Sequence, residues 1–263
     1  MLPFIQKIKD EKKLFGISIS KGGVVTYIRS LGWVSLAKLI TLPLSFITVA
    51  YVARVFGPTN FGTINYVLSV NILFAVLANL GIDNAVYKEL LVRKEERDKI
   101  LGSAIALKVC TSLIAFVGSS IAILSSHESS QIKILVIVAA VQFLTQPLLL
   151  LSFDFLKEKE TKYVTVAQIT TSIISSVLKV ALVTWYPSLL LFILITAIEN
   201  MVTSGMYVYF IVFVKKWNIR LSLSRVEFVE LLKLALPLAL FSASTELYSR
   251  IDQVMLKHYL DIS

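Results

Sequence analysis

Charged residues, cysteine and histidine are all scarce in this 263-residue chain, and each shortage excludes a class of protein. Charged residues make up 16% of the chain, against about 25% in a typical soluble domain. The single cysteine, Cys110, excludes an internal disulfide framework and any cysteine-based zinc site. The two histidines, His127 and His258, stand at the edges of apolar segments, so we interpret them as interface residues and not as catalytic groups. No P-loop motif occurs, which excludes ATP binding by that route.

Apolar residues are correspondingly abundant. They make up 56% of the chain and its mean hydropathy is +0.78, whereas about 45–50% apolar residues are typical of soluble domains. A helix needs ~20 apolar residues to cross a bilayer, and seven segments approach that length. The sequence therefore predicts an all-α polytopic membrane bundle. The expected helices lie at about 30–55, 61–80, 101–124, 133–153, 163–186, 188–214 and 231–260.

The distribution of lysine and arginine predicts the orientation of this bundle. The net charge is +9, and the basic residues fall mainly on the N-terminal tail and on alternate connections. The opposite side has little beyond Arg54, Lys133 and Lys257. By the positive-inside rule we expect the tail, residues 1–23, to be cytoplasmic, and we therefore expect the protein to lie in the cytoplasmic (inner) membrane. The tail lacks a signal-peptide pattern, and no motif suggests a nucleic-acid partner. The basic connections are 83–99, 154–162 and 215–230.

Several charged residues remain inside the expected helices, where charge is costly and usually faces a protein interior or a water-filled cavity. Arg29 and Lys108 are near helix ends and can snorkel to the membrane surface. Other charges lie within polar stripes at helical spacing, such as Thr165, Gln168 and Lys179 in the fifth helix. We therefore hypothesise a shared hydrated cavity for substrate. Its candidate residues are Lys38, Gln168, Lys179, Glu199, Asn200, Glu246, Arg250 and Gln253.

Two structural interpretations of these stripes stay open. Stripes of serine and threonine are also typical of helix–helix packing faces, where small polar residues allow close approach. Glu246 precedes Arg250 by four residues, the favourable order for an ion pair within one helix, so that pair could serve structure alone.

Two motifs give the chain a family resemblance. The first is the turn after the first helix, with Ala53-Arg54, Gly57-Pro58 and Gly62, and with Leu80-Gly81 closing the second helix. The other combines Leu236-Pro237 with an Arg250-x-Asp252 run. In this order they resemble the polysaccharide flippases of the multidrug/oligosaccharidyl-lipid/polysaccharide (MOP) exporter superfamily, which serve O-antigen, capsule or exopolysaccharide synthesis. The resemblance covers most of the chain.

The resemblance implies a transporter built from two helical halves, of which this chain holds the first six-helix half plus helix 7. The implied division is a cytoplasmic basic tail (1–23), a first transmembrane bundle (24–225) and the start of a second bundle (226–263). The resemblance implies that the second bundle is truncated in this sequence, and we therefore expect a complete transport path to require a C-terminal half or a second polypeptide.

The implied function is translocation of polyprenyl-pyrophosphate-linked oligosaccharide repeat units across the cytoplasmic membrane. It implies no enzyme activity, no cofactor and no metal, with coupling to a proton or sodium gradient as an option. The expected partners are membrane lipid, the lipid-linked oligosaccharide and polysaccharide polymerase machinery. Three alternatives remain: a multidrug or other solute antiporter of the same superfamily, a membrane glycosyltransferase or polymerase of the same pathway, and a non-transporting membrane fragment or scaffold.

Overall fold

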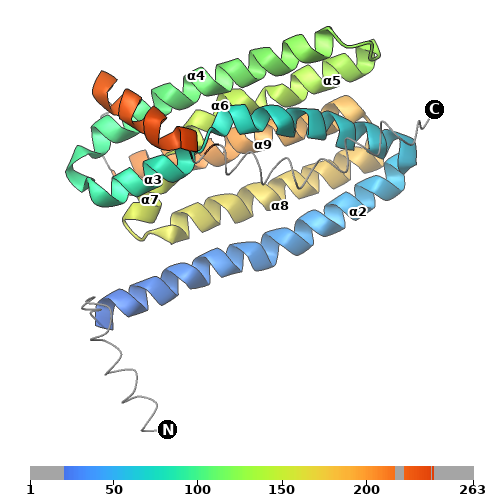
Figure 1. Ribbon diagram of the computed structural model, residues 1–263. Coiled ribbons are helices and arrows are strands. Elements are labelled where there is room, and N and C mark those ends of the chain that lie inside the picture. Colours follow the sequence, from blue (N-terminus) through green and yellow to red (C-terminus); the bar gives the residue numbers. More distant parts are fainter. Residues whose placement is uncertain (1–20, 217–221, 238, 240–263) are drawn as a thin grey trace, which may run out of the picture.

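The computed structural model describes residues 21–216, 222–237 and 239 (Figure 1). Helices are the only regular elements among these residues, as the sequence predicts. Within the same residues, five helical stretches are long and apolar enough to cross a membrane. The first of them, Arg29–Val92, contains the predicted first and second helices. The chain is thus a multi-pass, all-α membrane protein.

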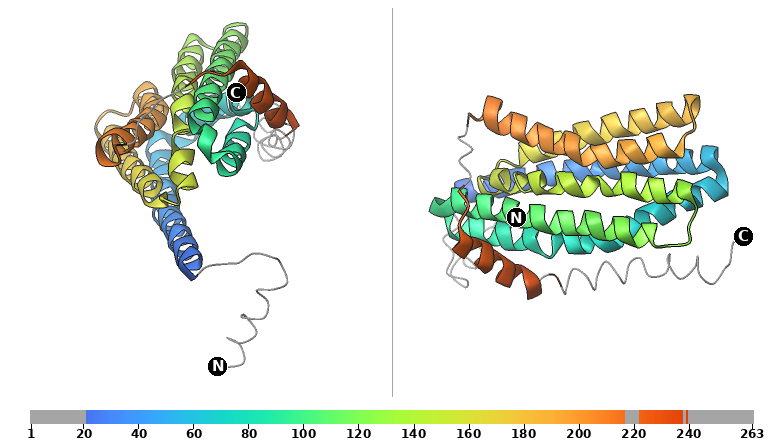
Figure 2. Two further views of the ribbon diagram at one scale, coloured as in Figure 1. Left: turned by 90° about the vertical axis from the view of Figure 1, so that its left-hand side faces the viewer. Right: turned by 90° about the horizontal axis from the view of Figure 1, so that it is seen from above.

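Helix α2 (Lys21–Asn79) folds back on itself at Gly57, whose φ of 74° and ψ of 174° interrupt the helix. A side chain at that φ would be strained, which is why glycine stands there. Pro58 follows at the first position of the next helix, where its missing N–H costs nothing. The predicted turn over 54–62 is thus reduced to one residue. We call residues 21–56 the first limb and residues 58–79 the second; they diverge from the turn as a V (Figures 1 and 2).

A second break separates α2 from α3 (Ile82–Val92), at Leu80 (φ 40°) and Gly81 (φ 70°). The sequence predicts a polar connection over residues 83–99, but most of this stretch is helical. The reason is an apolar face on α3, which buries Ile82, Ala85, Val86 and Leu90. A short 3-10 turn, η2 (Lys94–Glu96), then leads into α4 (Arg97–Leu124).

The predicted fourth helix is divided into three pieces, α5 (Ser130–Ala140), α6 (Gln142–Leu149) and α7 (Ser152–Lys157). Together they form one apolar stretch, Ser130–Lys157, long enough to span a membrane. The hydroxyl of Ser129 caps α5 by accepting a hydrogen bond from the Ile132 N–H. The fifth and sixth predicted helices correspond to α8 (Thr161–Trp185) and α9 (Leu189–Tyr209), the latter extended by a π-helical turn, η3 (Phe210–Val214).

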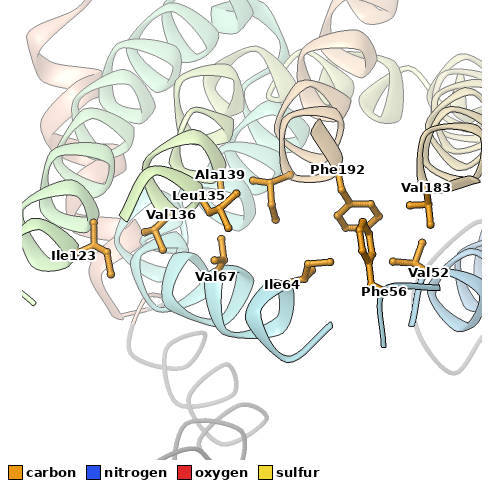
Figure 3. Close-up of a cluster of buried hydrophobic side chains, with 11 residues drawn as sticks. Val52, Phe56, Ile64, Val67, Ile123, Leu135, Val136, Ala139, Val183 and Phe192 are labelled. Carbon is orange, nitrogen blue, oxygen red and sulfur yellow. The ribbon is translucent and has the colours of Figure 1, made fainter. Parts of the chain in front are cut away.

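The two limbs of α2 pack on different partners. On the first limb, the Trp33 carbonyl accepts a hydrogen bond from Thr165, and Tyr51 bonds to Thr184, so this limb and α8 run parallel. On the second limb, Asn71 donates to the Val136 carbonyl of α5, and the Ala78 carbonyl accepts from Thr111 of α4. Near the Gly57 turn both limbs meet α5, α8 and α9 in one apolar cluster, in which Phe56 and Phe192 stack edge to face (Figure 3).

At the opposite end of the bundle, ion pairs join connections that are far apart in the sequence. Arg97 of α4 forms a bidentate pair with Asp154 of α7. Lys215 pairs with Glu160, and Arg93 pairs with Glu227. The three basic connections predicted to share one side therefore do lie together, and we call this region the basic end.

Residues 225–237 form a further helix that packs on α3 and α4 (Figure 1). Leu231 and Ala235 are buried there in a cluster with Ile82 and Leu101. The segment before it is also tightly fixed, because the Ser222 N–H donates to the Asp98 carbonyl. The remainder of the predicted seventh helix lies outside the described residues.

Candidate functional site

An ion pair between neighbouring helices lies within the membrane-spanning part of α8 and α9. Lys179 Nζ donates to Glu199 Oε2 over 2.9 Å, and Ser175 Oγ donates to the same oxygen over 2.9 Å. The Lys179 ammonium also lies over the Phe192 ring, 5.7 Å from its centroid. The side chain of Lys179 is 14% exposed and that of Glu199 is 32% exposed. Pairing of this kind is what makes charge tolerable at membrane depth, and the remaining exposure leaves both groups accessible.

The polar stripe of α8 lies between the contacts of this helix with α2 and α9. Thr165 contacts the first limb of α2, whereas Thr171 Oγ1 contacts Met206 Sδ of α9 at 3.8 Å. At 3.6 residues per turn, Gln168 and Lys179 fall between these two directions. Gln168 is exposed there. The opposite face of α8 carries exposed Val177 and its apolar neighbours, as expected for a lipid-facing surface.

Lys38 of the first limb lies on the same side as this stripe. Ser30 of that limb contacts the start of α8, since its hydroxyl donates to the Lys159 carbonyl over 3.4 Å. Lys38 is about 80° from Ser30 around the helix, on the flank that continues toward Gln168. It is exposed and has no acidic partner among the described residues. The structure therefore places Lys38 beside the α8 stripe without a contact to Glu199.

Of the remaining predicted cavity residues, one lies away from the ion pair and three lie outside the described residues. Asn200 is half-buried and is about 100° from Glu199 around α9, so it does not join the ion pair. Its carbonyl accepts a hydrogen bond from Ser204, which also contacts the Thr145 carbonyl of α6. The other three candidates lie outside the described residues, namely Glu246, Arg250 and Gln253.

Sequence reasoning missed several buried polar contacts. Lys108 does not snorkel: it is 3% exposed and donates to Asn79 Oδ1 over 2.9 Å and to the Asp83 carboxylate. Burial disfavours the charged lysine, and Asp83 compensates for part of this cost. Asn71, fully buried, joins the second limb to α5. The Leu80-Gly81 motif could have predicted the Lys108 contact. It marks a break in the helix, and Asn79 and Asp83, which both bond to Lys108, stand just before and just after that break.

The basic end is held by charge-assisted hydrogen bonds. Arg93 donates two bonds to the buried carboxylate of Glu227, at 2.9 and 2.8 Å, and pairs with Glu89 and Glu96 as well. The bond to Glu227 raises the pKa of Arg93 above its ordinary value. Likewise, the bond from Lys215 to Glu160 raises the pKa of that lysine. These ion pairs hold the connections together. Among the described residues, no group of three or more His, Cys, Asp or Glu side chains is placed to hold a metal ion.

Comparison with known proteins connects this fold to a transporter superfamily. Two solved MOP superfamily transporters match with a TM-score of 0.62 at 18% identity, over 87% of this chain and 55% of each of theirs. One is an outward-facing multidrug resistance MATE family transporter, and the other is a transporter from Pyrococcus furiosus described as having a binding pocket of reverse polarity. This similarity shows the shared fold, and the chain spans about half of their length.

Sequence comparison gives the family. The succinoglycan biosynthesis transport protein ExoT of Rhizobium meliloti (strain 1021) is 29% identical over 111 residues, which cover 40% of this chain and 22% of that protein. Residues 27–263 match the family described as polysaccharide biosynthesis protein. The chain therefore belongs to the polysaccharide biosynthesis protein family.

Proposed function

We propose that this chain forms the first bundle of a flippase that moves polyprenyl-pyrophosphate-linked oligosaccharide repeat units across the cytoplasmic membrane. One observation carries the proposal: a lysine–glutamate pair at membrane depth lies on an accessible polar stripe, and a second lysine on the same side has no acidic partner in the described part of the chain. Lys179 and Glu199 form the pair, and Lys38 is the second lysine. The family of the chain supports a polysaccharide precursor as the cargo.

The physics of this site suits an anionic headgroup. Bringing a pyrophosphate to membrane depth is costly, and nearby cations lower that cost. Lys179 would exchange Glu199 for phosphate oxygens, while Gln168 hydrogen-bonds sugar hydroxyls. Asn200, about 100° from Glu199 around α9, would contact the sugar away from the phosphate. The polyprenyl tail would stay in lipid beside the bundle. Once released by Lys179, the Glu199 carboxylate could take up a proton or attract a counter-ion, and this would couple transport to an ion gradient.

The proposal extends to residues outside the described part. Arg250 would add a third cation from helix 7, with Glu246 and Gln253 beside it. A second bundle would complete the path, because alternating access requires two bundles that rock against each other. Polysaccharide polymerase machinery would receive the translocated unit. Translocation makes and breaks no covalent bond, so we propose a transporter and not an enzyme.

A multidrug antiporter is the second candidate, since one of the two solved transporters is a multidrug resistance protein. Export of cationic drugs favours an acidic site, whereas the stripe described above carries Lys38 and Lys179 against one acid, Glu199. This excess of positive charge favours an anionic cargo.

The test is the Lys179→Ala substitution in the complete transporter, with Lys179→Arg as the conservative variant. We expect surface polysaccharide to fall about tenfold for the alanine variant, as loss of a charge-assisted contact predicts, and to be retained in part for arginine. Lys88→Ala is the matched control, because Lys88 is an exposed lysine at the basic end. Unchanged polysaccharide at a normal membrane level of K179A would refute the cargo site. Drug resistance that changes instead would support the antiporter.

Orientation requires its own experiment. In a Cys110→Ser background, single cysteines at Lys99 and Ser126 should react with a membrane-impermeant thiol reagent from opposite sides of the membrane. We expect the Lys99 position, at the basic end, to react only from the cytoplasmic side. Labelling of both positions from one side would overturn the proposed topology.

A further inference from the structure

Acidic residues at the basic end are almost fully used by other partners. Arg97 forms ion pairs with Asp98 and Asp154, and Lys215 forms one with Glu160. Arg93 forms ion pairs with four glutamates. Glu158 Oε1 lies 3.6 Å from Lys157 Nζ. Three cations near the α2–α8 contact have no acidic partner among the described residues, and all three are exposed. They are Arg29, Lys159 and Lys162.

The backbone brings these three cations together. The Ser30 hydroxyl, next to Arg29, donates to the Lys159 carbonyl, and Lys162 follows in the first turn of α8. Lys159 has a φ of 60°, at the turn between α7 and α8. All three therefore lie at one corner of the basic end, where the first limb of α2 passes the start of α8.

Helix geometry places this corner on the lipid-facing side of the α2–α8 contact. Arg29 is about 100° from Ser30 around α2, on the flank opposite to Lys38. On α8, Lys162 precedes the contact residue Thr165 by three positions and Gln168 follows it by three, so the two diverge to opposite flanks. Because α2 and α8 run parallel, the flanks of Arg29 and Lys162 face the same way. The candidate transport stripe lies on the other side.

An apolar surface continues from this corner along the same flanks. Leu36 and Ile47 of α2 are 42% and 64% exposed, and Ile173 and Val177 of α8 are 44% and 60% exposed. This surface follows the membrane-spanning direction of both helices, and lipid chains are its natural solvent. We call the three cations and these four apolar residues the lipid seam.

We propose that the lipid seam binds a resident acidic phospholipid. Its phosphate contacts Arg29, Lys159 and Lys162, and its acyl chains lie along the apolar residues of α2 and α8. Charge complementarity selects an anionic headgroup over a zwitterionic one, and the apolar surface selects a lipid over free phosphate. The site needs only that the basic end lies at a membrane surface, so it is independent of the transported cargo.

Native mass spectrometry of the full chain, delipidated in detergent and titrated with phosphatidylglycerol, tests the proposal. The variant Arg29→Gln/Lys159→Gln/Lys162→Gln should bind phosphatidylglycerol about a hundredfold more weakly than the unmodified chain. The matched control, Lys88→Gln/Lys99→Gln/Lys233→Gln, removes three exposed cations that lie outside the seam. It should bind phosphatidylglycerol within about twofold of the unmodified chain. Equal losses in both triple variants would show nonspecific attraction and overturn the site.

Two further measurements separate the sources of the phosphate and the effects of folding. Inorganic phosphate and phosphatidylcholine should not displace bound phosphatidylglycerol; displacement by inorganic phosphate would overturn the role of the acyl chains. The charge-preserving variant Arg29→Lys/Lys159→Arg/Lys162→Arg should keep its lipid. If this variant folds normally, by size-exclusion profile, yet loses the lipid as fully as the glutamine variant, the electrostatic assignment is refuted.

Discussion

At the basic end, Arg93 alone reaches four glutamates. Along α8 and α9, in the membrane interior, Lys179 reaches one carboxylate, that of Glu199, which also accepts a hydrogen bond from Ser175. The partners also differ. The Arg97–Asp154 and Arg93–Glu227 pairs join separate connections and bury their carboxylates, while the interior pair joins neighbouring helices and leaves the Glu199 side chain 32% exposed. A carboxylate that is buried against its cation fixes structure, whereas one that stays accessible leaves the pair able to exchange with a ligand. The comparison supports a structural role for the basic end, and it is the reason why we propose the interior pair, and not the basic end, as the transport site.

The largest expected effect is the loss of Asp154, which is 1% exposed and paired with Arg97. Asp154→Ala leaves the Arg97 guanidinium without its buried carboxylate. We therefore expect a loss of about 3–5 kcal/mol in the free energy of unfolding. Thermal melting in detergent and membrane abundance measure this loss. Asp98→Ala is the control, since Asp98 is 43% exposed and its pair should contribute less than about 1 kcal/mol. Similar losses for both variants would contradict the structural role of the buried pair.

Gly102→Ala tests the packing of the basic end without changing any charge. A Cβ at Gly102 would lie 2.5 Å from the Ser222 carbonyl oxygen, so we expect a loss of about 1–3 kcal/mol. The Ser103 bonds to Ser224 should weaken with it. Gly205→Ala in α9, where no atom lies within 4 Å of the added carbon, is the control and should be neutral or slightly stabilising. A neutral melting temperature for G102A would show that residues 222–224 are not held as described.

The double variant Lys179→Met/Glu199→Met tests the interior pair for function apart from stability. Replacing both partners removes the charge without leaving either one unpaired, so we expect little change in melting temperature. Surface polysaccharide should nevertheless fall about tenfold, or about 1.4 kcal/mol. Glu199→Met alone should lower the melting temperature, because it leaves Lys179 without its carboxylate. Normal polysaccharide in the double variant would assign the pair to structure and remove the proposed contrast.

The smallest expected effect is the pH dependence of the Lys215–Glu160 pair. Pairing raises the pKa of Lys215, so its contribution is complete below the pKa of an unfolded lysine, about 10.4. It is lost only as the pH rises through the higher folded value. The melting temperature of Glu160→Gln should therefore be lower than that of the unmodified chain from pH 7 to pH 9, by the equivalent of about 0.2–1 kcal/mol for this exposed pair. The difference should disappear in more alkaline buffer; a difference confined to high pH would contradict the assignment.

Local sequence patterns predicted much of the fold. Apolar length located the spans, Gly57-Pro58 located the reversal of α2, and alternation of basic connections identified those that meet at the basic end. The helical conformation of α3 was not predicted, because the charged residues of 83–99 hid a four-residue apolar face. The breaks within the predicted fourth helix were also missed, since Val141 and Leu151 carry no local signal of a helix end.

Part of the candidate site could be predicted in the same way. Stripe spacing placed Gln168 and Lys179 on one face of α8, and the structure adds the contact of Lys179 with Glu199. The structure also shows that Asn200 lies away from the Lys179–Glu199 contact. The orientation of this chain in the membrane and the contributions of Glu246 and Arg250 stay predictions.

By itself, the sequence determined that this protein is a bundle of membrane helices, where its first reversal lies and which connections carry the positive charge, because these properties depend on composition and on periods of a few residues. The tertiary structure alone decided the partner of each charge: Lys108 with Asp83, Arg97 with Asp154, and Arg93 with Glu227. The physical reason is that an ion pair requires atoms within 4 Å, and for residues dozens of positions apart that distance is set by how whole helices pack.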